Sequence, residues 1–284
     1  MLLAILLSTL QAPGFVVKES NDLYLELTEK GVQIGDKKIT LPAPTLTDGM
    51  TAKEQTAQLQ KLAGIDYTLD DLQRDSVVAS HVYKCRSVEN GDPKHPAYVL
   101  DCWFVFHAED SKVAKIEHPQ FLAAGSDRKQ HVLSSKEVQE RKLKTLADPK
   151  LKERWEHLEY ALLDKIQIRA TNRTVMTRGA DWILVARKID NSFQGDKKYP
   201  NEWQRIKENE EGRLVPNGEP SPYESAGMYL KITRLKEPNG AWLAEFHQVA
   251  LEPKEWFGDA NPLRSKLPLL VQSEVRSFRR EMKK

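Results

Sequence analysis

The sequence of 284 residues contains little cysteine and none of the common catalytic or nucleotide-binding motifs. Its two cysteines, Cys85 and Cys102, are too few for a disulfide scaffold and lack metal-site spacing. It has no glycine-rich loop ending in Gly-Lys-Ser/Thr, so nothing predicts a phosphate cradle. The Gly-x-Ser-x-Gly turn of α/β-hydrolases is also missing. These absences predict no cofactor and leave no recognisable catalytic residue.

Charge of one sign is not in excess either. Lysine and arginine number 43 against 41 acidic residues, a net charge of +2, and they are scattered along the chain. A nucleic-acid partner is disfavoured because it would call for a basic stripe. The seven histidines include no His-x-His or His-Glu-x-x-His motif. His107 and Glu109 would point the same way at a strand end, but a solvated strand end explains them more simply than a metal site.

Long hydrophobic runs are confined to the amino terminus. Residues 1–10 read MLLAILLSTL, which is the length of a signal-peptide core and too short to span a bilayer. The run ends at Ala12 before Pro13, and no basic residue precedes it. We interpret 1–12 as a signal-peptide-like segment, so that the protein is exported to the periplasm or beyond. The alternative is a first strand or helix of a cytoplasmic protein.

Alternating apolar and polar residues predict antiparallel strands, because one face of such a sheet is buried and the other solvated. The Asn239-Gly240 pair marks the clearest hairpin turn. The predicted strands occupy 15–41, 77–88, 98–108, 166–189 and 228–251.

Helices are predicted by capping boxes and by apolar residues at helical spacing. Capping boxes at 51–54 and 134–137 start two of them, and 69–75 forms another short one. We expect 109–157 to be a helical insertion. The final helix, 263–282, carries its leucines, valines and Phe278 on one face.

The stretch 190–225 is rich in Asn, Pro, Gly and Glu, so we expect an irregular loop there. It would expose Phe193, Tyr199 and Trp203.

The two cysteines fall on the two strands of one predicted hairpin. Centring its turn on 91–96 places Cys85 opposite Cys102 and Tyr83 opposite Phe104. In an oxidising compartment a Cys85–Cys102 disulfide would stabilise the fold by about 3 kcal/mol. A register shifted by two residues would leave two reduced thiols on the same face instead.

Aromatic residues suggest a binding cavity. Tyr83, Phe104, Phe106 and Trp182, with Trp242 as a further candidate, could line a space between the sheet and the last helix. The simpler interpretation is a packed core.

Over residues 31–282 the order of elements resembles the helix-grip arrangement of START-like proteins, in which an antiparallel sheet curls around a C-terminal helix. Separately, segment 1–12, Leu41-Pro-Ala-Pro44, Asp101-Cys-Trp-Phe-Val105 and the ending from Trp256 resemble exported proteins of planctomycete-type bacteria. That second resemblance implies a compartment and no activity.

Together these patterns predict one α+β domain over 13–284, an antiparallel, meander-like sheet packed by a long C-terminal helix. Three classes of function follow, in this order. The first is a non-enzymatic binding or structural protein of the cell envelope that acts on a protein partner through surfaces such as 190–225. The second is a carrier of an apolar ligand between sheet and helix. The third is a hydrolase with dispersed catalytic residues, which buried and mutually bonded carboxylates or histidines in a cleft would support.

Overall fold

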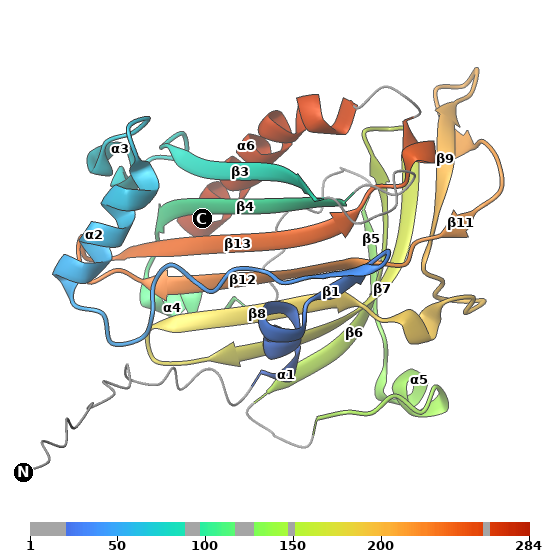
Figure 1. Cartoon of the computed structure of the whole chain (residues 1–284), viewed down its shortest axis with the longest axis horizontal. Coiled ribbons are helices and arrows are strands. Elements are labelled where there is room, and N and C mark those ends of the chain that lie inside the picture. Colours follow the sequence, from blue (N-terminus) through green and yellow to red (C-terminus); the bar gives the residue numbers. More distant parts are fainter. Residues whose placement is uncertain (1–20, 89–96, 117–127, 147–150, 258–261) are drawn as a thin grey trace, which may run out of the picture.

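The computed structural model describes residues 21–88, 97–116, 128–146, 151–257 and 262–284. They form an α+β fold built on a large, open antiparallel sheet (Figure 1). The signal-peptide-like segment predicted at 1–12 lies outside the described residues, as does the predicted hairpin turn at 91–96. Among the described helices, none has the length and apolar character needed to cross a membrane.

Eleven strands of the described chain form the main sheet, and every pairing between them is antiparallel, as predicted. Their order is β10-β9-β7-β8-β12-β13-β4-β3, with β6 on β7, β5 on β6 and β11 on β9. The bounds are β3 (His81–Val88), β4 (Ala97–His107), β5 (Lys129–Val132), β6 (Lys152–Leu162), β7 (Ile166–Arg178), β8 (Trp182–Ile189), β9 (Glu202–Glu208), β10 (Leu214–Pro216), β11 (Ser221–Pro222), β12 (Ala226–Arg234) and β13 (Ala241–Leu251).

The remaining elements cover the two faces of the sheet. They are α1 (Asp22–Leu25), the π-helix η2 (Glu26–Lys30), the small hairpin β1 (Val32–Ile34) and β2 (Lys37–Ile39), α2 (Ala52–Ala63), α3 (Leu69–Gln73), α4 (Asp110–Val113), α5 (Ser135–Glu140), the 3₁₀ turns η3 (Asn191–Phe193) and η4 (Lys254–Trp256), and α6 (Pro262–Lys283). The capping boxes at Thr51 and Ser134 start α2 and α5 as expected.

The long C-terminal helix packs on one face of the sheet, as predicted. Helix α6 contacts β3 and β4. Its buried residues Val271, Val275 and Phe278 join a core with the apolar side chains of β4, β12 and β13. On the opposite face, α1 and β1 cover the middle of the sheet, and α2 and α3 cover one end of it (Figure 1). The sheet is therefore buried on both sides over much of its area.

The predicted strand at the start of the domain is wrong over 22–30, where the chain is helical. The Asn21 side chain accepts a hydrogen bond from the Tyr24 backbone N–H, which caps α1. Leu23, Tyr24 and Leu27 are all buried. Positions 23 and 27 fit strand alternation and helical spacing equally well, so the periodicity alone could not decide between them.

The predicted helical insertion 109–157 is wrong in its middle and at its end. Strand β5 occupies 129–132, and β6 begins at Lys152 and pairs along its whole length with β7. The four residues from Trp155 to Leu158 are all buried. A strand buried on both faces loses its alternation, and Trp155 and Leu158 then imitate a helical stripe.

The expected irregular loop 190–225 contains η3, β9, β10 and β11. Its aromatic residues are not exposed. Phe193 and Tyr199 pack into a small core with Trp155, and Trp203 is buried in the main core. The stretch therefore lacks the exposed aromatic surface that sequence composition suggested.

The predicted register of the cysteine hairpin is wrong by two residues. Tyr83, not Cys85, lies opposite Cys102, and Cys85 lies opposite Leu100. A two-residue shift keeps every side chain on its face, so alternation cannot detect it. Diagonal positions are about 7–8 Å apart, farther than a disulfide spans. Accordingly no disulfide joins the two cysteines, both of which are described.

Candidate functional site

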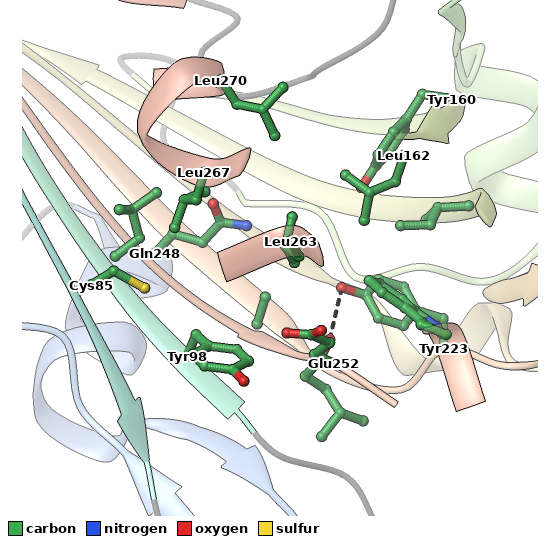
Figure 2. A pocket seen from close by; sticks show the side chains of 15 residues that line it. Cys85, Tyr98, Tyr160, Leu162, Tyr223, Gln248, Glu252, Leu263, Leu267 and Leu270 are labelled. Carbon is green, nitrogen blue, oxygen red and sulfur yellow. Dashed lines mark hydrogen bonds between the residues drawn. The ribbon is translucent and has the colours of Figure 1, made fainter. Parts of the chain in front are cut away.

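An apolar cavity of about 120 Å³ lies between the sheet and the first half of α6 (Figure 2). Side chains from five strands, from the connections that follow β11 and β13, and from α6 line it. They are Cys85, Tyr98, Leu100, Tyr160, Leu162, Ile168, Tyr223, Gln248, Ala250, Leu251, Glu252, Trp256, Leu263, Leu267 and Leu270.

One wall of the cavity is set by the register of β3, β4 and β13. Leu100 lies opposite Cys85 on β3 and opposite Gln248 on β13, and Tyr98 lies opposite Ala250. Because side chains two residues apart share a face of a strand, these pairs form a continuous patch facing α6. The register that separates the two cysteines thus also places Cys85 in this wall.

Helix α6 provides the second wall. Leu263, Leu267 and Leu270 are spaced by four and three residues, so they lie on one face of the helix. These leucines are only half-buried because they border the cavity, whereas Val271 and Val275 further along are buried. Pro268 lies within this half of the helix.

Two other strands and two aromatic side chains close the cavity. Tyr160 on β6 lies opposite Ile168 on β7. The Tyr223 ring lies 5.5 Å from the ring of Trp256, and its hydroxyl donates to the Leu251 carbonyl at 3.4 Å. Burial raises the pKa of Tyr160 to about 12 and that of Tyr223 well above its usual value. Both phenols therefore stay neutral near pH 7.

Within this apolar lining, Glu252 is a buried carboxyl group. Its side chain is 6% exposed, and its Oε2 atom has no hydrogen-bond partner among the described residues. Burial raises the pKa of Glu252 to about 7. The indole Nε1 of Trp256 is likewise buried without a partner in the described chain. One acceptor and one donor thus line the same cavity with no hydrogen bond to the described part of the chain.

A second cavity of about 70 Å³ shares Tyr160, Tyr223 and Gln248 with the first. Arg187 and Asn172 line it, so it is more polar. The Arg187 guanidinium donates to Thr174 Oγ1 at 3.3 Å and to Glu156 Oε2 at 3.4 Å. This arginine is therefore already engaged with protein groups.

The aromatic residues proposed from the sequence lie elsewhere in the fold. Phe104 and Phe106 pack edge-on against Phe278 of α6, with ring centroids 5.4 and 5.1 Å away. Tyr83 is exposed on β3, and Trp182 lies at an outer depression beside Arg234. None of the four is in the lining of the 120 Å³ cavity. A role for them in binding stays a prediction.

The cavity was foreseeable only in part. The predicted apolar face of the last helix contains its three leucines, for which the sequence left a packed core and a cavity as alternatives. Glu252 and Trp256 were missed. The available signal was a carboxylate directly after the apolar strand that ends at Leu251.

On the other face of the sheet, several ionisable residues are buried and hydrogen-bonded to protein groups. His247 Nδ1 lies 2.7 Å from Asp101 Oδ1. The Glu245 carboxylate accepts hydrogen bonds from the backbone N–H groups of Thr45 and Leu46 and from Trp103 Nε1. Neither cavity is lined by these residues. The cluster holds part of segment 41–48 on the sheet, and neither of the two cavities described above opens onto it.

The described residues contain no group of three or more His, Cys, Asp or Glu side chains arranged to hold a metal ion. His107, considered above as a ligand, contacts the Gln73 carbonyl through Nε2 at 2.7 Å. That contact fixes the end of β4 against α3.

Comparison with known proteins identifies no family. No protein-family model matches the chain, and no curated protein matches it. Among solved structures, the chain is similar to the human StarD13 (DLC2) lipid transfer and protein localization domain. The match covers 70% of this chain and 84% of that domain's chain, with a TM-score of 0.41 and 10% sequence identity. At this identity and TM-score, function has to be inferred from the side chains of this chain.

Proposed function

We propose that the protein binds a small apolar molecule, or the apolar part of a larger one, in the cavity between its sheet and α6. The observation that carries this proposal is the unfilled apolar space beside Leu263, Leu267 and Leu270. A packed core would have closed over these leucines, because empty space forfeits dispersion contacts. A carrier of an apolar ligand, the second class expected from the sequence, accounts for the space.

The size of the cavity limits its occupant. An engineered cavity of about 150 Å³ binds benzene, and sites for drug-sized ligands begin near about 300 Å³. A cavity of about 120 Å³ therefore suits one ring or a short alkyl chain. A longer apolar chain would extend into the neighbouring cavity of about 70 Å³ past Tyr160 and Tyr223.

The first class expected from the sequence has lost its main support. It relied on exposed aromatic residues in 190–225, and Phe193, Tyr199 and Trp203 are buried. Export of the protein, predicted from residues 1–12, is a separate question and stays a prediction.

Binding can be tested with toluene, followed by chemical-shift changes in ¹H–¹⁵N spectra. We expect saturable shifts in residues around Leu100 and Ala250. Leu267→Trp should weaken toluene binding at least tenfold, because the indole fills the cavity. Leu269→Trp is the matched control, since Leu269 is 62% exposed on the same helix and should leave affinity within twofold.

Two results would contradict the proposal. One is the absence of saturable toluene binding to the wild-type protein. The other is equal affinity for toluene in wild type and Leu267→Trp when both are folded by circular dichroism.

A further inference from the structure

The Oε2 atom of Glu252 has no hydrogen-bond partner in the described chain. The atom is buried, although a buried polar atom without a partner costs about 1–3 kcal/mol. By contrast, both oxygens of the buried Glu245 are engaged and together accept three hydrogen bonds. A carboxyl left unpaired in a cavity wall is therefore best explained by a partner that is not part of the protein.

The surroundings of Glu252 define what that partner is. In Figure 2 its carboxyl lies between the side chains of Tyr98 and Tyr223, and Leu263 lies nearby. No lysine or arginine is in the described lining, so nothing there would neutralise an anionic ligand beside the carboxylate. The other ionisable side chains in the lining are Cys85 and the three tyrosines. The electrostatics thus favour a hydrogen-bond donor and disfavour a second carboxylate.

From this arrangement we infer that the ligand is an apolar molecule whose polar end is a hydrogen-bond donor, a hydroxyl or a protonated amine, which binds Glu252 Oε2. The inference rests on the proposed function and specifies the class of ligand. The buried Trp256 Nε1–H supplies a donor for a ligand oxygen, as a hydroxyl would offer. The rings of Tyr98, Tyr223 and Trp256 would also suit an ammonium group, since aromatic faces attract cations.

A matched pair of isomers tests the hydrogen bond. Benzyl alcohol and anisole have the same atoms and a ring of the size that the cavity holds, but only the alcohol carries an O–H donor. The dissociation constant of anisole divided by that of benzyl alcohol measures the preference for the O–H donor. We expect this ratio to be at least fivefold lower in Glu252→Met than in wild type. Glu252→Gln keeps an acceptor oxygen and should hold the ratio within twofold of wild type.

A second pair of ligands, benzylammonium and benzoate, carries opposite charges. It distinguishes an ammonium donor from a hydroxyl donor and also tests an anionic ligand. At pH 8, where Glu252 is ionised, benzylammonium should bind wild type at least tenfold more tightly than benzoate. Glu252→Gln should reduce that preference to less than threefold. If wild type prefers benzyl alcohol to anisole but does not prefer benzylammonium to benzyl alcohol, the donor of the ligand is a hydroxyl.

Two outcomes would overturn the inference. The first is an unchanged anisole-to-alcohol ratio in Glu252→Met. The second is tighter binding of benzoate than of benzyl alcohol to wild type, which would assign the polar end to Arg187 in the second cavity. Toluene, which has no polar group, separates the two proposals. If toluene binds and Leu267→Trp blocks it, the cavity is a binding site even when Glu252 proves irrelevant.

Discussion

The side chain of Glu252 shows how one buried carboxyl links stability to pH. Its pKa in the folded protein is about 7, above the ordinary value of 4.5 for glutamate. A raised acid pKa means that the folded state holds the proton more tightly than the unfolded state. The stability that comes from the protonated form is therefore complete below pH 4.5 and is lost as the pH rises through 7.

Replacing Glu252 with Gln should remove this dependence. Near pH 5, where the carboxyl is protonated in the folded state, we expect the two proteins to unfold at similar urea concentrations. At pH 8 the wild type carries a buried carboxylate, so Glu252→Gln should gain on the order of 2 kcal/mol relative to it. Urea unfolding at both pH values measures this difference.

The control for that experiment is Glu255→Gln, because Glu255 is a close neighbour in the chain and is exposed. It should change the free energy of unfolding by less than about 0.5 kcal/mol at either pH. An identical response of wild type and Glu252→Gln to pH would show that the Glu252 carboxyl is solvated.

At the scale of single residues, local signals were predictable and buried polar contacts were not. The Thr51 and Ser134 capping boxes form as their sequences indicate, since all their partners lie within three residues. Glu252 and Glu245 look alike in the sequence. Their difference arises from contacts with segments far away, such as Thr45 and Leu46 for Glu245.

Among the elements, segment 41–48 depends on side chains of the sheet rather than on a strand partner. The Lys231 ammonium donates to the Leu46 carbonyl at 2.9 Å and to Asp48 at 3.3 Å. Glu245 accepts from Thr45 N at 2.7 Å and from Leu46 N at 3.3 Å. A buried acid and a buried base thus replace the backbone ladder that a strand would have made.

Changing Glu245 to Gln should loosen this segment selectively. An amide can turn only one oxygen toward two backbone N–H donors, so one donor is left unsatisfied at a cost of about 1–3 kcal/mol. We expect the Thr45 and Leu46 amides to exchange with deuterium at least tenfold faster, while amides in the middle of β12 keep their protection. Glu237→Gln serves as an exposed control.

Uniform acceleration of exchange across the whole chain would contradict that prediction, because it would mean that Glu245 stabilises the sheet itself. Unchanged exchange at Thr45 and Leu46 would mean that Lys231 alone holds the segment.

Elements with a strong local pattern were predicted correctly from the sequence. The β12–β13 hairpin turns at Asn239-Gly240, and the last helix runs as its apolar stripe indicates. Strand β6 was missed since Trp155 to Leu158 are buried on both faces, which erases alternation. The β3–β4 register was missed because a shift by two residues preserves the pattern of faces.

At the scale of the whole molecule, Arg279 attaches α6 to the edge of the sheet through hydrogen bonds. Its guanidinium donates to the backbone carbonyls of Val105, Ala79 and Ser80 at 2.9, 2.5 and 2.9 Å, although the residue is 2% exposed. Burial lowers its pKa to about 10, which still leaves it charged near neutral pH. The attachment therefore joins the last helix, β4 and the start of β3 in a single contact.

Arg279→Ala should destabilise the entire fold by about 3 kcal/mol. Three backbone carbonyls would lose their hydrogen-bond donor, and the Phe104 ring would lose the guanidinium that lies over it. Global unfolding in urea measures the loss. Arg280→Ala, the exposed neighbour on the same turn, should cost less than about 0.5 kcal/mol. A loss confined to α6, with the sheet unfolding at its usual urea concentration, would show that helix and sheet unfold separately.

The general architecture was predictable and a cavity between sheet and helix was expected as an alternative, whereas the residues that line it were not predictable. Alternating runs followed by one long amphipathic segment specify an antiparallel sheet with a helix on its face. Whether such an interface is filled depends on the sizes of side chains from β3, β4, β6, β7, β13 and α6, which meet only in the folded chain. An apolar stripe reads the same whether it packs against neighbours or borders a void.

The position of Pro268 makes the two halves of α6 unequal. Proline has no N–H, so the carbonyl four residues earlier lacks its helical partner. The half that follows is held by the buried side chains of Val271, Val275, Phe278 and Arg279. The half that precedes has Leu263 and Leu267, which are only partly buried and border the cavity. Fraying of the first turns therefore costs less free energy than detaching the last ones. The cavity therefore borders the half of α6 that fewer buried side chains hold in place.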